Sequence, residues 1–279
     1  MKKYFIILIL IAVLAGGIFL PRNFGLEKQV VFRAEKGEGS KEIASNLQKD
    51  GLVWWGPFFN FYVLISGTAH KLQAGGYFLS PSMNIPQIAG KLSSGDIAKA
   101  KITIPEGFTS EQIVQTLSRT VLDSIESRTV LDLFREYEGY LFPDTYEINY
   151  GANEAEIIKM MTDNFDKKTA DLKITPEIVI AASILEKEVK TKEEKALVSG
   201  VLWKRLKVGM PLQVDAAMWT YEHYGLPEKP ISNPGLESIL AALYPKDSSY
   251  WYYLSKPSGE TIFTKTLDEH NIAKAKYLK

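Results

Sequence analysis

The stretch TPEIVIAASILEKEVKTKEEKALVSGVLWKRLKVG, residues 175–209, decides the fold of this chain. Thr175 is expected to cap a helix, with Pro176 at its first position and Glu177 at its positive end. The residues from Ile178 to Leu185 are apolar on nearly every side, which predicts a central helix that is buried all round. The rest of the chain is expected to pack around this helix.

Glu186 follows this apolar run on the same helix. Ser183, Ala182 and Val179 precede it by three, four and seven residues, so its carboxyl group shares a face with small and apolar side chains. Loss of water there disfavours the anion and raises the pKa, as a general acid working near neutral pH requires. Glu186 is therefore the candidate catalytic residue.

Two other interpretations of these carboxylates stay open. Glu186 can be the first exposed charge at the end of the helix, paired with Lys190 one turn later. Glu188 is the competing acid, but Lys192 lies one turn beyond it, which favours a surface ion pair for Glu188. Spacing alone leaves the choice between the two carboxylates open.

Composition narrows the class of protein. The chain has 279 residues, enough for two domains or for one large domain with an appendage. It is 46% hydrophobic, and 33 basic residues balance 33 acidic ones, so charge gives no indication of a nucleic-acid partner. There is no cysteine, which excludes disulfides, thiolate nucleophiles and cysteine-ligated metals. His70, His223 and His270 are far apart in sequence, so neither a metal nor a cofactor is expected.

An uninterrupted apolar run extends from Tyr4 to Leu20 and follows two lysines. As a helix it is roughly 25 Å long, slightly less than a hydrocarbon core of about 30 Å. The lysines favour a cytoplasmic N-terminus. A cleaved signal peptide is the alternative, but the run ends in GGIFLPRN and lacks a small-x-small cleavage site. We expect residues 1–20 to be an uncleaved single-pass anchor of the cytoplasmic membrane, with residues 21–279 outside.

Strand–turn–helix patterns repeat after this run. Residues 29–34 have the pattern of a strand, and the following helix is expected to start at a Ser40 cap. The aromatic run over residues 54–62 predicts a second buried helix or a packed aromatic segment. The segments GGYFLS and MNIPQIAGKLSSG, within residues 75–95, repeat the strand and the helix, which indicates a small β-α-α-β unit. A capping box at Thr109 and Gln112 begins another helix.

The motif EGYLFPDTYEI, residues 138–148, combines turn residues with aromatic side chains. One interpretation is a structural aromatic turn that closes a core. The other is a wall on which sugar rings stack, with Glu138 and Tyr140 as candidate binding residues.

The last third of the chain holds the other candidate binding residues. A capping box at Thr191 and Glu194 begins a helix that Gly209 ends. Beyond it, polar side chains lie among turns, the usual place of binding residues: Gln213, Asp215, Tyr221, Tyr224 and Asn233. The segments YWYYLS and ETIFTK predict a hairpin, and a short terminal helix follows with His270 and Asn271.

Taken together, these segments resemble the endolytic murein transglycosylase (MltG, YceG-like) family. The motifs EGYLFPDTY, ASILEKEV, VLWKRLKVGMPLQVD, ISNPGLESILAALYP and YWYYLSKPSGETIFTKTLDEHN agree with it in order and spacing over nearly the whole chain. The resemblance implies cleavage of nascent peptidoglycan strands between N-acetylmuramic acid and N-acetylglucosamine, leaving 1,6-anhydro ends and limiting strand length. It carries the family's catalytic glutamate over to Glu186, and it implies a LysM-like subdomain over residues 29–95.

The expected fold is therefore α+β. It comprises an N-terminal transmembrane helix, a small LysM-like α+β subdomain, and a larger mixed α+β catalytic domain built around the buried helix. The expected domains are residues 1–20 (cytoplasmic tip and anchor), 21–98 (subdomain), 99–150 (connecting strand–helix segment and aromatic turn) and 151–279 (transglycosylase domain). The implied partners are glycan strands, the membrane and peptidoglycan synthases, and no nucleic acid.

A lytic transglycosylase needs only one carboxyl group, because the C6 hydroxyl of the substrate attacks the anomeric carbon. Glu186 would protonate the leaving oxygen and then take the proton from that hydroxyl. Gln213, Asp215 and Asn233 are expected to support the developing charge. The alternatives are a water-using muramidase, with Asp215 or Glu188 as the second carboxylate, and a non-catalytic peptidoglycan-binding scaffold.

The chain departs from the family pattern after the LQVD motif. The segment between LQVD and YEHY is shorter than is usual in the family, and Glu222 and His223 stand where an asparagine and a threonine are expected. A trimmed loop can widen the cleft, change the cleavage position or weaken activity.

Overall fold

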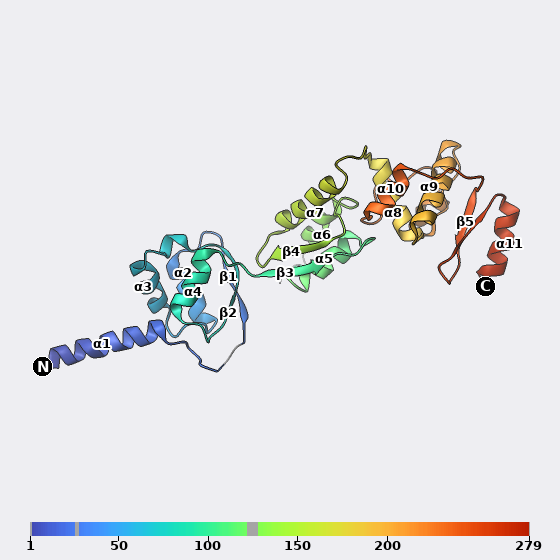
Figure 1. Ribbon diagram of the computed structural model, residues 1–279. Coiled ribbons are helices and arrows are strands. Elements are labelled where there is room, and N and C mark those ends of the chain that lie inside the picture. Colours follow the sequence, from blue (N-terminus) through green and yellow to red (C-terminus); the bar gives the residue numbers. More distant parts are fainter. Residues whose placement is uncertain (1, 26–27, 122–127, 279) are drawn as a thin grey trace. The chain divides into compact units, whose positions relative to one another are not determined.

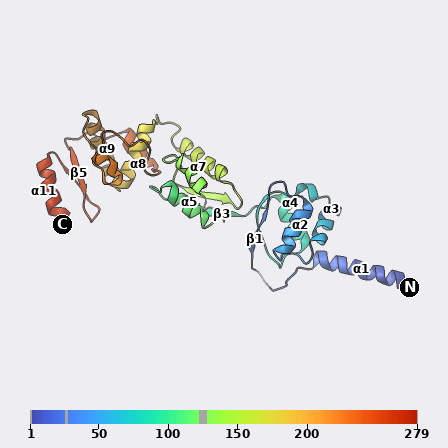
Figure 2. The same ribbon diagram turned by 180° about the vertical axis from the view of Figure 1, so that it is seen from behind.

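The computed structural model describes residues 2–25, 28–121 and 128–278. The chain forms two units, one of residues 1–101 with 147–152 and the other of residues 102–146 with 153–279 (Figures 1 and 2). The fold is mixed α+β, as the sequence predicts. The finer division into four domains, with a LysM-like subdomain, stays a prediction.

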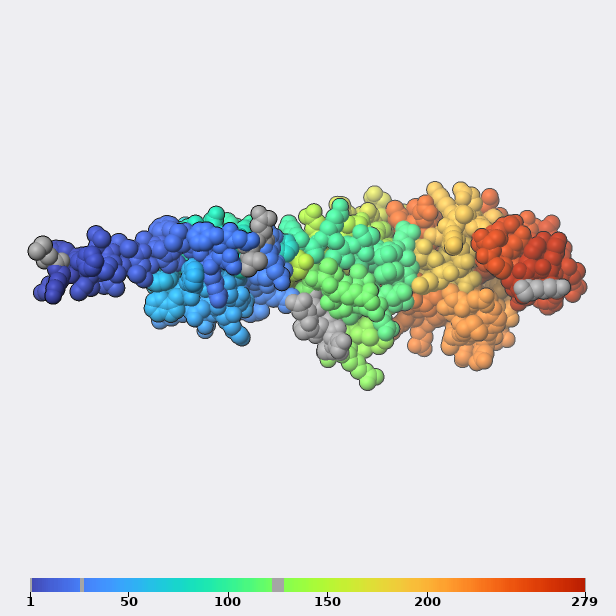
Figure 3. Space-filling view, turned by 90° about the horizontal axis from the view of Figure 1, so that it is seen from below, coloured from blue at the N-terminus to red at the C-terminus, as the bar shows by residue number. Residues whose placement is uncertain are grey.

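Unit 1 begins with α1 (Lys2–Phe19), which is exposed over most of its length and projects from the rest of the unit (Figures 1 and 3). It is long and apolar enough to cross a membrane, with a mean hydropathy of 2.1. A signal sequence has the same length and composition. The last turns of α1 differ from the rest, because Ile18 is buried in the core of unit 1 and Leu14 packs against it.

The rest of unit 1 is a two-stranded antiparallel sheet covered by helices. Strand β1 (Val30–Ala34) pairs with β2 (Gly75–Leu79), and Phe32 lies opposite Tyr77. Both side chains are fully buried. The helices are α2 (Ser40–Lys49), α3 (Gly56–Ile65) and α4 (Ile85–Ser94), with a 3-10 turn η1 (Ala69–Lys71) before β2. The predicted strands and the β-α-α-β order are confirmed.

Two predictions for unit 1 are corrected. The cap of α2 is Gly39 rather than Ser40, and the Gly39 amide donates a hydrogen bond of 2.8 Å to the Glu42 carboxylate. Ser40 instead donates its hydroxyl proton to Asn60 on α3, which ties the two helices together. The aromatic run does form a helix, but α3 is buried on one face only.

Strands β3 (Lys99–Thr103) and β4 (Thr145–Asn149) form a second two-stranded sheet. The helices α5 (Ser110–Ser118) and α6 (Arg128–Arg135) follow β3, and α7 (Glu154–Lys168) follows β4. The Thr109–Gln112 capping box at the start of α5 is confirmed, with Thr109 accepting from the Gln112 amide.

The centre of unit 2 is α8 (Pro176–Glu188), which packs against α9 (Lys192–Lys207), α10 (Leu236–Leu243) and the 3-10 segment η2 (Asp215–Tyr221). All seven residues from Val179 to Leu185 are buried, as the run of apolar side chains predicts. Pro176 does occupy the first turn, whereas the Thr175 hydroxyl caps no backbone amide of the helix.

The secondary structure of the C-terminal part of unit 2 also agrees with the sequence prediction. The Thr191–Glu194 capping box begins α9. The predicted hairpin is β5 (Tyr252–Ser255) paired antiparallel with β6 (Thr261–Thr264). The terminal helix α11 (Leu267–Tyr277) packs against both strands.

Candidate active site

The two acidic side chains of the LEKE motif occupy the last turn of α8. The helix stops at Glu188 because Val189 turns to an extended conformation. Glu186 and Glu188 are two residues apart, which is about 200° around the helix axis, so their carboxylates face different sides. The two carboxylates of this turn therefore have different neighbours.

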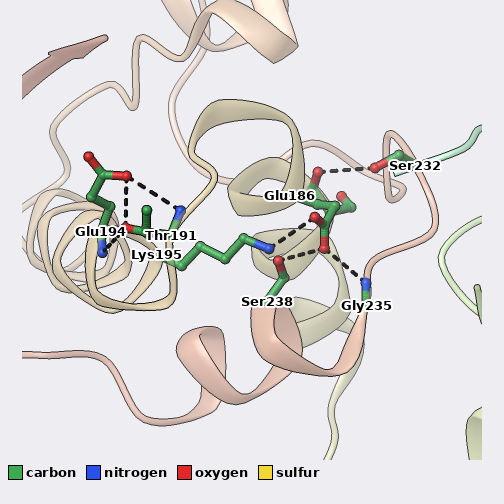
Figure 4. A network of polar contacts seen from close by, with 8 residues as sticks. Glu186, Thr191, Glu194, Lys195, Ser232, Gly235 and Ser238 are labelled. Atoms are coloured by element: carbon green, nitrogen blue, oxygen red, sulfur yellow. Dashed lines mark hydrogen bonds and ion pairs between the residues drawn. The ribbon is translucent and has the colours of Figure 1, made fainter. Parts of the chain in front are cut away.

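Glu186 lies in a closed network (Figure 4). Its carboxylate accepts hydrogen bonds from the Lys195 ammonium (3.0 Å), the Gly235 amide (2.9 Å) and the Ser238 hydroxyl (2.7 Å). Only 3% of the Lys195 side chain and 8% of the Glu186 side chain are exposed. The burial expected for Glu186 is confirmed, but its charged partner is Lys195 on α9 rather than Lys190.

The segment before α10 holds this network against α8. Ser183 accepts a hydrogen bond from the Ile231 amide at its hydroxyl and one from the Ser232 hydroxyl at its carbonyl. A Cβ atom at Gly235 would lie within 2 Å of the Glu106 carboxylate, so a side chain there would displace the Glu106 side chain. Partial burial and the neighbouring Glu186 charge raise the pKa of Glu106.

Glu188 faces a cleft of about 910 Å³ instead. Its carboxylate accepts the Ala216 amide at 2.7 Å and the Tyr253 hydroxyl at 3.3 Å. Desolvation raises its pKa, and the negative charge of Asp215 adds to the shift. The predicted surface ion pair of Glu188 with Lys192 is therefore wrong, because this carboxyl group is partly buried and bonded within the cleft.

Three predicted binding residues line the same cleft: Gln213, Asp215 and Tyr221. The Tyr221 hydroxyl donates to Asp215 at 2.5 Å, and burial together with this bond raises the pKa of Tyr221 to about 12. Gln213 has a φ of 50°, in the left-handed region that a non-glycine residue seldom adopts. Such local strain clusters at functional sites, which makes the segment from Gln213 to Tyr221 a candidate substrate-contacting loop.

Arg205 on α9 holds the walls of this cleft together. Its Nε donates to the Trp251 carbonyl at 2.9 Å and its Nη1 to the Leu212 carbonyl at 2.6 Å. Its guanidinium lies 5.0 Å from the centre of the Tyr252 ring. Burial lowers the pKa of Arg205. One buried cation therefore fixes the loop before Gln213 and the hairpin that carries Tyr253.

The helix α11 forms the remaining wall, to which His270, Asn271 and Lys274 contribute. His270 is buried and stacks on Tyr252 at 5.4 Å between ring centres. Burial lowers the pKa of His270, and the charge of Lys274 acts in the same direction. Neutral imidazole is the resulting form at neutral pH.

The other predicted binding residues lie away from this cleft. Asn233 is fully buried, and its side chain binds the Gly139 and Leu141 amides, the Phe108 carbonyl and the Glu138 carboxylate. Burial raises the pKa of Glu138. These contacts join the aromatic turn to the segment before α10.

Tyr140 and Tyr224 also have other surroundings. Tyr140 packs on the core around α8 with its ring 5.1 Å from that of Phe165. Tyr224 is 72% exposed and is not among the residues that line the cleft. A binding role for Glu138, Tyr140, Tyr224 and Asn233 stays a prediction.

Two functional side chains were missed at the sequence level, Lys195 and Arg205. Both occur at helical spacing with the buried residues Val198 and Leu202 of α9, so each is a charged residue on an apolar helix face. Such a residue needs a partner in the interior. That signal was present in the sequence, although the partners themselves were not predictable from it.

The described residues, 2–25, 28–121 and 128–278, contain no group of three or more His, Asp or Glu side chains that could hold a metal ion. The site thus consists of a desolvated carboxyl group in an open polar cleft, bordered by tyrosines and by a strained loop. It defines the chain as an α+β protein with a carboxyl-bearing cleft suited to proton transfer.

The chain belongs to the YceG-like family, whose sequence model matches residues 32–219 and 218–276. It is 30% identical over 327 aligned positions to the endolytic murein transglycosylase of Bacillus subtilis, covering 94% of this chain and 91% of the relative. The endolytic murein transglycosylase of Streptococcus pneumoniae strain D39 is 27% identical, over 96% of this chain and 64% of that protein.

A crystal structure of a YceG-like protein from Listeria monocytogenes is similar to this fold, with a TM-score of 0.55 and 28% identity. The similarity covers 89% of this chain and all of the other. The two matched pieces of the family model meet at Met218 and Trp219, inside η2. This is the segment in which the sequence comparison with the family predicts missing residues.

Proposed function

We propose that this protein is a membrane-anchored endolytic lytic transglycosylase that cleaves peptidoglycan between N-acetylmuramic acid and N-acetylglucosamine. The observation that carries the proposal is the Glu188 carboxyl group, desolvated and directed into a large cleft. The family membership and the names of the relatives support the substrate class.

The proposed reaction uses Glu188 twice. Its raised pKa keeps a proton available to the glycosidic oxygen, so the bond between that oxygen and the anomeric carbon breaks as the proton is transferred. The C6 hydroxyl of the muramic acid then bonds to the anomeric carbon, and the Glu188 carboxylate takes the hydroxyl proton. The enzyme ends in its starting form and the product carries a 1,6-anhydro ring.

The neighbours of Glu188 have supporting roles in this proposal. The Ala216 amide donates to one carboxyl oxygen and the Tyr253 hydroxyl to the other, which together orient the group within the cleft. Asp215, steadied by the Tyr221 hydroxyl, supplies negative charge near the oxocarbenium ion that develops at the anomeric carbon. Gln213 is positioned to bind a polar group of the sugar, such as the N-acetyl group.

Glu186 remains the competing candidate that the sequence argument favoured. Against it stands its network, because a buried ammonium, that of Lys195, is fixed on its carboxylate, which also accepts from Gly235 and Ser238. In addition, Glu186 is not among the described residues that line the cleft. We therefore assign proton transfer to Glu188 and the stabilisation of the end of α8 to Glu186.

The anchor and its orientation belong to the same proposal. The helix α1 would span the cytoplasmic membrane once, with its lysines inside and both units on the other face, where peptidoglycan is made. Synthases of glycan strands are then natural partners, and the LysM-like part would lie next to the membrane. The limit on strand length would follow from cleavage close to the site of synthesis.

The test is digestion of purified peptidoglycan by the full-length protein in detergent, followed by mass analysis of the glycan ends. We expect 1,6-anhydromuramic acid ends, and none with Glu188→Gln. Ordinary reducing ends would identify a water-using muramidase, for which Asp215 is the candidate second carboxylate. Binding of glycan without any new ends would identify a scaffold. In the transglycosylase, Asp215→Asn should slow the reaction but leave the anhydro product unchanged.

A further inference from the structure

The helix α3 has an apolar face that the rest of unit 1 does not cover. Its sequence, GPFFNFYVLI, contains no charged residue. Phe59 and Val63 are fully buried, whereas the opposite side exposes 41% of Phe61, 57% of Leu64 and 65% of Ile65. A surface helix in water normally places polar side chains on its outer face, and α3 departs from that pattern.

Two tryptophans just before α3 extend this face. Trp54 is 57% exposed and Trp55 is 52% exposed. Tryptophan combines a large apolar ring with one N–H donor, and it is enriched where a bilayer meets water. We call these five side chains, Trp54, Trp55, Phe61, Leu64 and Ile65, the α3 face.

The α3 face lies next to the end of α1. The ring of Phe58 fills the space over Gly17, where a Cβ atom would come within 2.2 Å of it. The Trp54 indole donates to the Pro21 carbonyl at 3.1 Å, directly after α1. Figures 1 and 2 show α3 at the end of unit 1 from which α1 projects. These contacts join α3 to the last turn of the membrane helix.

The length of α1 places that last turn at the membrane surface. Eighteen residues make a helix of about 27 Å, close to a hydrocarbon core of about 30 Å. The side chains that contact this end of α1, Phe58 at Gly17 and Trp54 at Pro21, therefore lie at the level of the lipid headgroups. Basic residues occur at both ends of this region, Arg22 after α1 and Lys71 after α3, and both are exposed, as suits contact with lipid phosphates.

We propose that the α3 face inserts into the headgroup region of the bilayer beside α1, so that unit 1 docks on the membrane surface. This inference rests on the proposed membrane anchor and goes beyond it, because a single span alone leaves the attached unit free to tilt. Docking would hold unit 1 at one height above the lipid. A second protein or another copy of this chain is the alternative occupant of the face.

The absence of cysteine from the chain allows a direct test with single spin labels. Full-length protein with Ile65→Cys is labelled with a nitroxide and reconstituted into vesicles of phosphatidylcholine and phosphatidylglycerol. Leu64→Cys provides a second labelled position on the same face. Ile272→Cys on α11 is the matched control, since Ile272 is 69% exposed on unit 2. Ile7→Cys in α1 reports on the anchor itself.

Collision rates with oxygen, which concentrates in lipid, and with a nickel chelate, which stays in water, give the result. We expect the ratio of oxygen to nickel collisions at Ile65 and Leu64 to be several-fold higher than at Ile272. A ratio equal to that at Ile272 would overturn the proposal, and so would protection from both reagents, which indicates a protein occupant. A water-like ratio at Ile7 would instead show that the anchor is wrong, which separates the two failures.

Discussion

Glu186 and Glu188 have different surroundings, although only one lysine separates them in sequence. Glu186 is closed in by a buried ammonium, an amide and a hydroxyl. Glu188 has an amide and a tyrosine hydroxyl as donors, faces a cleft, and lies near the negative charge of Asp215. The first arrangement pairs a carboxylate with a buried cation, and the second directs a carboxyl group with a raised pKa toward a cleft.

This comparison separates burial from catalytic competence. Both carboxyl groups lose water, but a buried group serves as an acid only if the substrate can reach it and no fixed cation holds it. Glu186 meets neither condition in the described structure, and Glu188 meets both. In the proposed assignment, the LEKE motif supplies a structural ion pair and an acid–base group from one helical turn.

The largest effect that we expect is the loss of turnover caused by the substitution Glu188→Gln. The amide keeps the shape and the Ala216 contact, but it cannot donate and retrieve a proton. We expect the rate of glycan cleavage to fall by about a hundredfold to ten-thousandfold with the fold intact. Cleavage assays together with circular dichroism check this. Near-normal cleavage by the folded variant would show that Glu188 takes no part in proton transfer.

The next largest effect is the loss of stability that we expect from Glu186→Gln. This change leaves the Lys195 ammonium buried without its counter-charge, which should cost about 3–5 kcal/mol of unfolding free energy. Denaturant titration measures the loss. The control is the double variant Glu186→Met with Lys195→Met, which should recover much of that stability because no buried charge remains. A fully stable but inactive Glu186→Gln would instead return catalysis to Glu186.

The pH dependence of both stability and catalytic rate should reflect the ionisation of Glu188. Its pKa lies above the ordinary 4.5, so the folded protein still holds a proton that the unfolded chain has released. Stability should therefore fall as pH rises from the ordinary value through the raised one, and Glu188→Gln should abolish that fall. The catalytic efficiency, kcat/KM, should decline with rising pH through the same raised pKa. Unfolding and rate profiles with the same pH dependence in both proteins would contradict this origin.

The smallest effect expected is from Tyr221→Phe. The change removes the hydroxyl that donates to Asp215, so the carboxylate loses its fixed position while the aromatic ring stays. We expect kcat/KM to fall about tenfold, equivalent to roughly 1.4 kcal/mol. Tyr224→Phe is the matched control, since Tyr224 lies three residues further on, is exposed and does not line the cleft, so the rate should stay unchanged. A slower reaction would instead support the predicted binding role of Tyr224.

Much of the fold could be predicted from local sequence. The apolar run at residues 178–185, the Thr191–Glu194 capping box and the hairpin after Trp251 are all present where expected. Each is determined by residues close together in the chain, through side-chain period, cap chemistry or turn residues. The family could be recognised for a related reason, because its motifs are contiguous segments.

The candidate site was predictable only in part. Gln213, Asp215 and Tyr221 were expected to bind substrate, and they do line one cleft. Asn233 belongs to the same polar segment in sequence, yet it is fully buried against the aromatic turn. Whether a polar side chain among turns faces solvent or a buried carbonyl depends on elements far away in the chain, so composition does not decide it.

The sequence by itself determined much of the secondary structure, the buried central helix, the apolar N-terminal helix and the family. The tertiary structure decided which carboxylate of the LEKE motif faces the cleft and that α3 is exposed on one side. The physical reason is that helical period places side chains on faces, whereas the partner of each face comes from distant segments. Lys195 from α9 encloses the Glu186 carboxylate. The hairpin and the loop at Ala216 instead hold the Glu188 carboxyl group at the cleft.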